Sequence, residues 1–277
     1  MLSEKEVRAL ASTAKEIRIL SLEMIGHAGK GHLGGALSIA DLLALLYFKR
    51  ARIDPQNPKW EDRDRIVLSK GHAGTALYAA LSLRGFFPRE ICYTMNQNGT
   101  TLPSHVDMRK VPGADMTAGS LAQGFSAAVG MALAARLDKK GHKVYTIIGD
   151  GESQEGEIWE AAMLAGNRKL SNLVAFCDNN GMQIDGLTDE INSLEPMDKK
   201  WEAFNWHVIR ANGHDIADID RAMDEAEKIT DKPVMIILKT VKGKGVSFAE
   251  GKVSSHSMTY GVAEAEAEVA RIRKEDE

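Results

Sequence analysis

Two short apolar runs, joined by one helix and each followed by a polar turn, constrain the fold of this chain more than any other feature. The first run, residues 144–148, ends in Gly-Asp-Gly at 149–151, and the second, residues 173–177, ends in Asp-Asn-Asn-Gly at 178–181. Runs of this length and composition predict buried strands, and the segment 155–168 between them predicts a helix. If the two strands are adjacent and parallel, both turns lie at the same edge of the sheet, where open α/β sheets bind ligands.

The composition of these turns points to a phosphorylated ligand held through a metal ion. Glycine on either side of Asp150 lets a backbone amide approach a phosphate closely, but the carboxylate itself would repel that phosphate. A divalent cation removes the repulsion, since Mg²⁺ in proteins takes one or two carboxylate or amide oxygens plus phosphate oxygens. Asp150 and Asn180, with a nearby backbone carbonyl, are therefore candidate ligands. The alternative is that both are ordinary βα turns rich in Gly, Asp and Asn.

The segment 149–186 resembles the cofactor-binding signature of thiamine-diphosphate enzymes, and of transketolases in particular. The fold that this resemblance implies is the diphosphate-binding (PP-type) α/β domain of that family. The cofactors that it implies are thiamine diphosphate and Mg²⁺, with Ca²⁺ or Mn²⁺ as alternatives. The implied metal ligands are Asp150, Asn180 and the backbone carbonyl of Met182, and the implied contacts with the diphosphate are Gly149, Asp150, Gly151 and Asn180.

Four histidines lie in segments that also resemble the family. Taken alone, one of them, His72, is more readily explained as a structural residue, because it stands where a predicted strand ends. The four are His32 in a glycine-dense segment, His72 in Ser-Lys-Gly-His, His105 in the loop-rich region 88–115, and His256 near the C-terminus. The resemblance implies that they bind sugar hydroxyls and move protons near neutral pH. It also implies that His72 and His256 face the cofactor.

Two further segments match the family next to the cofactor. The turn containing Gly119 and Leu121 resembles the turn near the thiazolium ring, with Ser120 and Ala122 where the family has proline and glycine. Glu155 matches a carboxylate that links neighbouring cofactor sites. Without the resemblance, Glu155 is explained as an acidic residue at the start of a helix.

The remaining pattern continues the alternation of strands and helices. Ser3 and Glu6 predict a capping box, and Ser38 is the predicted cap of a helix at 38–49. Further strands are predicted at 66–68, 208–210 and 234–238, and further helices at 75–84, 121–137, 216–229 and, solvated, 263–274. This order predicts one doubly wound, mostly parallel sheet with helices on both faces. We expect a single domain over residues 1–277, with 261–277 as a peripheral C-terminal helix.

Composition excludes several classes of function. The 277 residues suit one large α/β domain, and a net charge of −4 without a basic block argues against a nucleic-acid partner. The longest apolar stretch, residues 39–48, contains Asp41 and is too short to span a membrane. Two cysteines make no disulfide framework, and the charged N-terminus lacks a signal-peptide core. We therefore expect a cytoplasmic protein.

The resemblance extends from residue 4 to about residue 260, but only to the N-terminal part of a transketolase. The glutamate that activates the cofactor in this family belongs to the pyrimidine-binding domain, which this chain lacks. The resemblance therefore implies a partner, namely a separate C-terminal transketolase subunit. It also implies that the two kinds of chain form an α₂β₂ heterotetramer and that the isolated chain is inactive. The implied reaction transfers a two-carbon ketol unit from a ketose phosphate to an aldose phosphate, as in the pentose phosphate pathway.

Three other interpretations stay open at this point. The same cofactor fold serves 1-deoxyxylulose-phosphate synthase and the α subunits of 2-oxo acid dehydrogenases, although the segments around His32 and His72 favour transketolase. A non-catalytic module that binds thiamine diphosphate is a second alternative. A plain nucleotide-binding domain is the third, but the chain lacks a Gly-x-Gly-x-x-Gly turn after its first strand.

Overall fold

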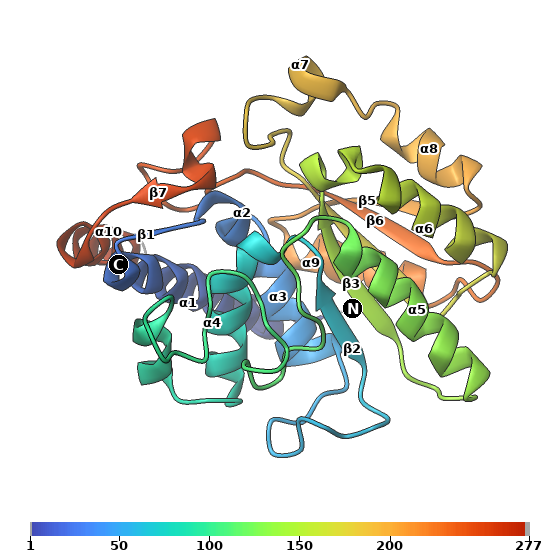
Figure 1. The fold of residues 1–277 in the computed structure, drawn as a ribbon, viewed down its shortest axis with the longest axis horizontal. Helices are drawn as coiled ribbons and strands as arrows, with labels where there is room; N and C mark the ends of the chain where they lie inside the picture. The colour runs from blue at the N-terminus through green and yellow to red at the C-terminus, as the bar shows by residue number, and fades with distance from the viewer. Residues whose placement is uncertain (1, 275–277) are drawn as a thin grey trace.

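A five-stranded parallel sheet in the order β2-β3-β4-β6-β5 forms the centre of the molecule (Figure 1). This computed structural model describes residues 2–274, so Met1 and the last three residues of the predicted 261–277 helix lie outside the described part. The strands of the sheet are β2 (Arg65–Leu68), β3 (Val144–Gly149), β4 (Leu173–Asn179), β5 (His207–Asn212) and β6 (Val234–Lys239). A separate antiparallel pair consists of β1 (Lys30–Gly31) and β7 (Met258–Thr259).

Helices cover both faces of the sheet, as predicted. The longer ones are α1 (Glu4–Ala28), α4 (Gly74–Arg84), α5 (Gln123–Leu137), α6 (Gly156–Asn167), α9 (Ile216–Ala226) and α10 (Val262–Lys274). The shorter ones are α2 (Gly34–Leu37), α3 (Ala40–Leu45), α7 (Thr188–Asn192) and α8 (Met197–Ala203). No helix within residues 2–274 is both long enough and apolar enough to cross a membrane.

Alternation along the strands builds two hydrophobic cores. In β3, Tyr145 and Ile147 pack in the core that includes α1, α3, α4 and α9, whereas Val144 and Ile148 pack in the core with α5, α6 and α8. This is the period-2 pattern of a strand that is buried on both faces. The predicted doubly wound α/β fold is therefore confirmed.

The strand register brings the carboxyl ends of the central strands to one level. Gly149 pairs with Asp178 across β3 and β4, and Asn179 pairs with Lys239 across β4 and β6. Because the strands are parallel, the turns after them emerge side by side. The two polar turns of the sequence therefore lie next to each other, as expected.

The N-terminal capping box is confirmed, but Ser38 is not the N-cap of the helix that follows it. The hydroxyl of Ser3 accepts a hydrogen bond from the Glu6 amide, and the Glu6 carboxylate accepts one from the Ser3 amide. Ser38 already has helical dihedral angles after α2, and its hydroxyl donates to Asp178 Oδ2 at 2.6 Å. The buried carboxylate of Asp178 therefore binds the Ser38 hydroxyl that the sequence pattern assigned to the start of a helix. The predicted helix 38–49 is instead divided into α3 and a π-helical turn at Leu46–Arg50, and α2 precedes it.

Two other predictions need correction. The region 88–115 is mostly irregular, but it contains a 3₁₀ helix at Arg89–Thr94. The C-terminal helix is not simply solvated, because Ala265, Val269 and Ile272 are buried. A Cβ atom at Gly26 would lie 2.7 Å from Ala265 Cβ, so glycine at this position of α1 allows α10 to pack closely.

Replacing Gly166 with alanine is expected to destabilise the fold, although alanine is the better helix former. A Cβ atom at Gly166 in α6 would lie 1.8 Å from the Phe204 carbonyl oxygen. We expect a loss of about 1–3 kcal/mol in the free energy of unfolding, as for other overpacked sites. The matched control is Gly130→Ala in α5, where a Cβ atom would have no described atom within 4 Å apart from its chain neighbours and the helix's own backbone, and where alanine should stabilise by up to about 1 kcal/mol. Urea unfolding measures both, and a Gly166→Ala variant as stable as Gly130→Ala would contradict this packing.

Candidate active site

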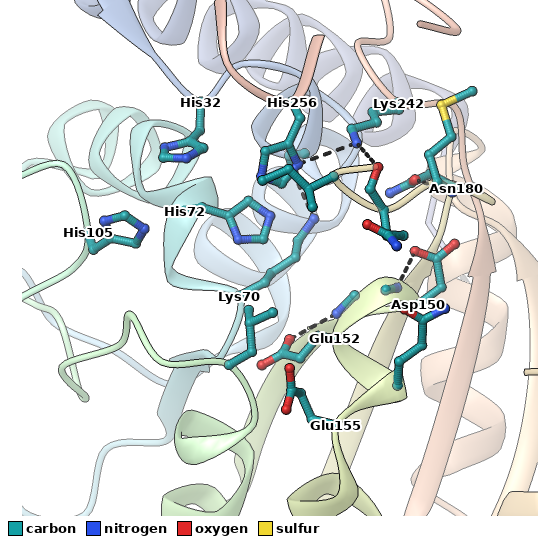
Figure 2. Close-up of a pocket in the computed structure, with 18 of the residues that line it drawn as sticks. His32, Lys70, His72, His105, Asp150, Glu152, Glu155, Asn180, Lys242 and His256 are labelled. Atoms are coloured by element: carbon teal, nitrogen blue, oxygen red, sulfur yellow. Dashed lines mark hydrogen bonds between the residues drawn. The ribbon is translucent and has the colours of Figure 1, made fainter. Parts of the chain in front are cut away.

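A cleft of about 450 Å³ opens at the carboxyl ends of β2, β3, β4 and β6. The candidate site residues from the sequence all line it, namely His32, His72, His105, Gly119, Leu121, Gly149, Asp150, Gly151, Glu155, Asn180, Met182 and His256. Figure 2 shows the histidines on one side of the cleft and Asp150 and Asn180 on the other. The structure thus brings together residues that are more than two hundred positions apart in the sequence.

Asp150 is the buried carboxylate at the end of β3, with a side chain held by two neighbouring turns. Its Oδ1 accepts a hydrogen bond from the Gly151 amide at 2.8 Å, and its Oδ2 accepts one from the Gly181 amide at 2.5 Å. Burial, together with the charge of Asp178, raises the pKa of Asp150 to about 7. A divalent cation at this carboxylate would offset the cost of burying its charge, so the donor set fits a metal ion.

The side-chain amide of Asn180 is oriented by its neighbours. Its Nδ2 donates to Asp178 Oδ2 at 2.9 Å, and its Oδ1 accepts from the Met182 amide at 3.1 Å. Because the nitrogen is bound to Asp178, the oxygen is the atom that remains available to a cation. A Cβ atom at Gly151 would lie 2.7 Å from Gln183 Cβ, so only glycine lets these two turns approach as they do.

Asp178 and Lys70 form a buried ion pair below the cleft that the sequence patterns did not reveal. Lys70 Nζ lies 2.5 Å from Asp178 Oδ2, and the Thr240 hydroxyl donates to the other carboxylate oxygen. Burial alone would raise the pKa of Asp178, but Lys70 and the hydrogen bonds to it lower this pKa below its usual value. In the sequence, Lys70 is marked only by the Gly-His that follows it, and Asp178 only by its place two residues before Asn180. Neither pattern is distinctive.

Glu152 is a second buried carboxylate that the sequence patterns did not reveal. It accepts hydrogen bonds from the Ser69 hydroxyl at 2.5 Å, the Ala122 amide at 2.9 Å and the Gly149 amide at 3.1 Å. It therefore ties the ends of β2 and β3 to the turn before α5, where Ala122 has a left-handed φ of 70°. Burial raises the pKa of Glu152. Nothing in the sequence marks this role except its place two residues after Asp150.

Lys242 is a buried cation at the cleft, and sequence reasoning missed it as well. It is only 2% exposed, and its ammonium has the Gln183 carbonyl and His256 Nδ1 as neighbours, each at 3.4 Å. Among the described residues, no carboxylate forms an ion pair with Lys242, and burial and the charge of Lys70 lower its pKa to about 8. In Figure 2, Lys242 projects between His256 and Asn180, on the side of the cleft away from His105.

The four histidines form one cluster around His32. Ring centroids lie 5.2 Å apart for His32 and His105, 5.4 Å for His32 and His256, and 4.9 Å for His72 and His256. Burial, more than any neighbouring charge, lowers the pKa of each member of the cluster. The imidazoles are therefore neutral at physiological pH, and each has one nitrogen that accepts a proton or a hydrogen bond.

The other predicted residues lie at the mouth of the cleft. Gly119 is exposed, and a Cβ atom there would lie 3.9 Å from His105 Cβ. Glu155 precedes α6 with extended dihedral angles and is exposed. Within residues 2–274, the Glu155 carboxylate has neither a hydrogen bond nor an ion pair.

We expect the stability of the fold to decrease in mildly acidic solution because of these histidines. The pKa of His256 is about 4 in the folded chain, against an ordinary value of 6.5, because of burial and the nearby Lys242. As the pH falls below 6.5, the unfolded chain takes up a proton that the folded chain takes up only near pH 4, so unfolding is favoured. Urea unfolding between about pH 7 and about pH 4.5 should show this loss, and a smaller one for His256→Gln. An unchanged pH profile in that variant would contradict the burial of a neutral His256.

The fold and the cleft define a class of protein. A parallel sheet that presents an aspartate turn and an asparagine turn from adjacent strands, with glycines against them, fits the thiamine-diphosphate-binding domains that the sequence resembles. Residues 10–275 match the family described as the transketolase, thiamine diphosphate binding domain. The chain belongs to the transketolase family, as an N-terminal subunit of the split type.

Relatives of nearly the same length are themselves subunits. The chain is 57% identical over 274 residues to the 6-deoxy-6-sulfo-D-fructose transketolase subunit SqwG of Clostridium sp. (strain MSTE9), covering 99% of both chains. It is 42% identical over 272 residues to an apulose-4-phosphate transketolase subunit of Phocaeicola vulgatus, covering 98% of this chain and 95% of the relative.

Among solved structures, the transketolase from Leishmania mexicana superposes with a TM-score of 0.89 at 32% identity. The match covers 96% of this chain but only 41% of that one, so the chain spans less than half of a single-chain transketolase.

Proposed function

We propose that this chain is the thiamine-diphosphate-binding subunit of a two-chain transketolase. The reaction transfers a two-carbon ketol unit from a ketose phosphate to an aldose phosphate, as in the pentose phosphate pathway. The observation that carries the proposal is the cleft itself, in which the buried Asp150 and the oriented Asn180 lie opposite four neutral histidines. One side fits a metal–diphosphate group, and the other fits the hydroxyls of a sugar.

In this proposal, Asp150, Asn180 and the Met182 carbonyl hold a divalent metal, with Mg²⁺ first and Ca²⁺ or Mn²⁺ as alternatives. Gly149 and Gly151 let the diphosphate approach the backbone, and Gly119 and Leu121 lie beside the ring system. When bound, thiamine diphosphate supplies the electron sink that allows the C2–C3 bond of a ketose to break. Burial and the charge of Asp178 raise the pKa of Asp150, and a bound cation would stabilise its ionised form, which supports the metal assignment.

Lys242 adds a positive charge to the diphosphate side of the cleft. A buried cation is normally paired, either within the protein or with a bound anion. Lys70 is paired with Asp178, whereas Lys242 has no carboxylate partner among the described residues. Its neighbour Gln183 directly follows Met182 and packs against Gly151 of the aspartate turn. In this proposal its ammonium therefore binds a phosphate oxygen that the metal does not take.

The histidines have distinct positions that fit distinct roles. His32 lies between His105 and His256, so these three can bind adjacent hydroxyls of an extended sugar. As neutral imidazoles, they can accept the proton of the C3 hydroxyl when the bond between C2 and C3 breaks, and return it to the acceptor. His72 lies beside His256, with ring centroids 4.9 Å apart, and in this proposal both face the cofactor side.

The partner in this proposal is a separate C-terminal chain that carries the pyrimidine-binding domain, in an α₂β₂ heterotetramer. Two observations support it: the relatives of matching length are named as subunits, and single-chain transketolases are more than twice as long. The exposed Glu155 carboxylate at the cleft mouth is placed to join an interface. A cytoplasmic location without nucleic-acid or membrane partners stays a prediction from composition.

A donor assay with the assembled enzyme tests the reaction. Ketol transfer to ribose 5-phosphate is measured with thiamine diphosphate, in Mg²⁺ or in EDTA, from xylulose 5-phosphate and from 6-deoxy-6-sulfo-D-fructose. The second donor is included because the relative at 57% identity is named for it. Metal-dependent transfer from either ketose supports the proposal. The better donor shows whether the enzyme prefers a phosphate or a sulfonate at the end of the sugar. Cofactor binding without transfer from any ketose would instead indicate a non-catalytic module.

A further inference from the structure

A histidine outside the cleft holds the segment that carries Lys242. His214 follows β5, its side chain is only 14% exposed, and it does not line the cleft. Its Nε2 accepts a hydrogen bond from the Val241 amide at 2.8 Å, and its Nδ1 lies 2.9 Å from Asp41 Oδ2 on α3. Because Val241 directly precedes Lys242, His214 holds the backbone one residue before the lysine and does not contact the cleft itself.

The two contacts of His214 determine which ring nitrogen carries the proton. A backbone amide can only donate, so Nε2 must present its lone pair to Val241, and Nδ1 then donates to Asp41. Arg18 also pairs with Asp41. Burial alone would raise the pKa of Asp41, but the hydrogen bond from His214 and the charge of Arg18 lower it, so this carboxylate is ionised. Asp41 therefore keeps the acceptor nitrogen of His214 directed at Val241.

A second contact holds the other side of the lysine. The Gly243 amide donates to the Gly34 carbonyl at 2.9 Å, so the residues before and after Lys242 are both hydrogen-bonded through their amides. A Cβ atom at Gly34 would lie 2.8 Å from Lys242 Cγ, so glycine in α2 leaves room for the lysine stem. Of these two anchors, only the one at Val241 depends on a side chain, and it is the one that substitution can remove.

We propose that His214 is a positioning residue that holds Lys242 at the diphosphate side of the cleft through the amide of Val241, with Asp41 fixing its tautomer. This inference rests on the proposed function, because it assigns to His214 an effect on the cofactor that passes through Lys242. A buried histidine that only stabilised the fold would change the melting temperature without changing the affinity of the folded enzyme for its cofactor.

Two substitutions separate the two contacts of His214. In His214→Asn, the side-chain amide can still donate to Asp41 from near the Nδ1 position, but the acceptor for Val241 is lost. In His214→Gln, the side-chain oxygen can reach the Nε2 position and accept from Val241. The measurement is isothermal titration calorimetry of the assembled enzyme with thiamine diphosphate in Mg²⁺, well below each variant's melting temperature. We expect about 3- to 10-fold weaker binding for His214→Asn, the loss typical of one hydrogen bond, and partial rescue in His214→Gln.

A double-mutant cycle with Lys242→Met tests whether the effect passes through the lysine. Lys242→Met should itself weaken cofactor binding, and adding His214→Asn to it should weaken binding no further, because the group that His214 positions is gone. The loss of thermal stability caused by His214→Asn should persist in both backgrounds. The matched control is Lys244→Met on the same segment, whose ammonium is paired with Glu250 at 3.1 Å and which should leave cofactor affinity unchanged.

Two results would overturn the inference. One is wild-type affinity for thiamine diphosphate in His214→Asn, and the other is an equal loss from His214→Asn with and without Lys242. If His214→Asn does not fold, an affinity of His214→Gln as low as that of Lys242→Met would overturn it in the same way, because the acceptor for Val241 is present there. Failure of the wild-type complex to bind thiamine diphosphate is a different result, and it would overturn the proposed function itself.

Discussion

Replacing Asp150 with asparagine is expected to abolish metal-dependent binding of thiamine diphosphate to the assembled enzyme. The substitution keeps the shape of the side chain but removes the only charged candidate metal ligand in the two turns. Loss of a partner that merely orients a ligand weakens metal binding about 10- to 100-fold, and loss of a ligand itself should exceed that. The measurement is a titration with thiamine diphosphate, in Mg²⁺ and in EDTA.

The control for this variant is Asp185→Asn in the same segment. Asp185 is exposed and does not line the cleft, so its charge is solvated. This variant should bind the cofactor as the wild type does, and circular dichroism should show both variants folded. If Asp150→Asn and the wild type bound thiamine diphosphate with equal, Mg²⁺-dependent affinity, Asp150 would not be a metal ligand.

Replacing Asp178 with asparagine is expected to cause the largest loss of stability of any single substitution considered for this chain. The change leaves the ammonium of Lys70 buried without its ion-pair partner. The hydroxyls of Ser38 and Thr240, which donate to different oxygens of Asp178, retain only one acceptor oxygen between them. Removing one member of a buried ion pair lowers the free energy of unfolding by about 3–5 kcal/mol. The double variant Lys70→Met/Asp178→Asn should recover part of this loss, because no unpaired charge remains.

Urea unfolding of the four chains of this double-mutant cycle gives the coupling between Lys70 and Asp178. The exposed pair of Lys199 and Glu202, at 2.8 Å, serves as the control, and Glu202→Gln should cost less than about 1 kcal/mol. If Asp178→Asn lowered the free energy of unfolding as little as Glu202→Gln does, the buried ion pair would not stabilise the strand ends. A double variant less stable than Asp178→Asn would likewise contradict the charge argument.

The parts of the fold that follow from local patterns were predictable from the sequence. The β-branched run of β3 and the capping box at Ser3 depend on residues close to one another along the chain, and both were predicted where they occur. The meeting of the Asp150 and Asn180 turns was also predictable, because parallel strands joined by one helix leave their carboxyl ends at one edge. Most positions in the cleft came from resemblance to a family and not from residue chemistry alone.

The residues that sequence reasoning missed depend on contacts between distant segments. Ser38 has the composition of a helix cap, but its hydroxyl is bound to Asp178, 140 positions away. Glu152 looks like an ordinary acid at a helix start until the fold brings Ser69 and the Ala122 amide to it. Lys242 belongs to a basic loop segment, and it is set apart only by its burial and by the lack of a carboxylate partner within residues 2–274. No periodicity or local motif encodes such long-range pairings.

The measurement that tests the central claim most directly is ketol transfer by the purified chain, alone and mixed with its candidate C-terminal partner. The donor is a ketose phosphate, and thiamine diphosphate and Mg²⁺ are present at saturation. We predict no transfer by either chain alone, and transfer that rises to a plateau at equal amounts of the two chains. Full activity of this chain alone would contradict the claim that its site is completed by a second subunit.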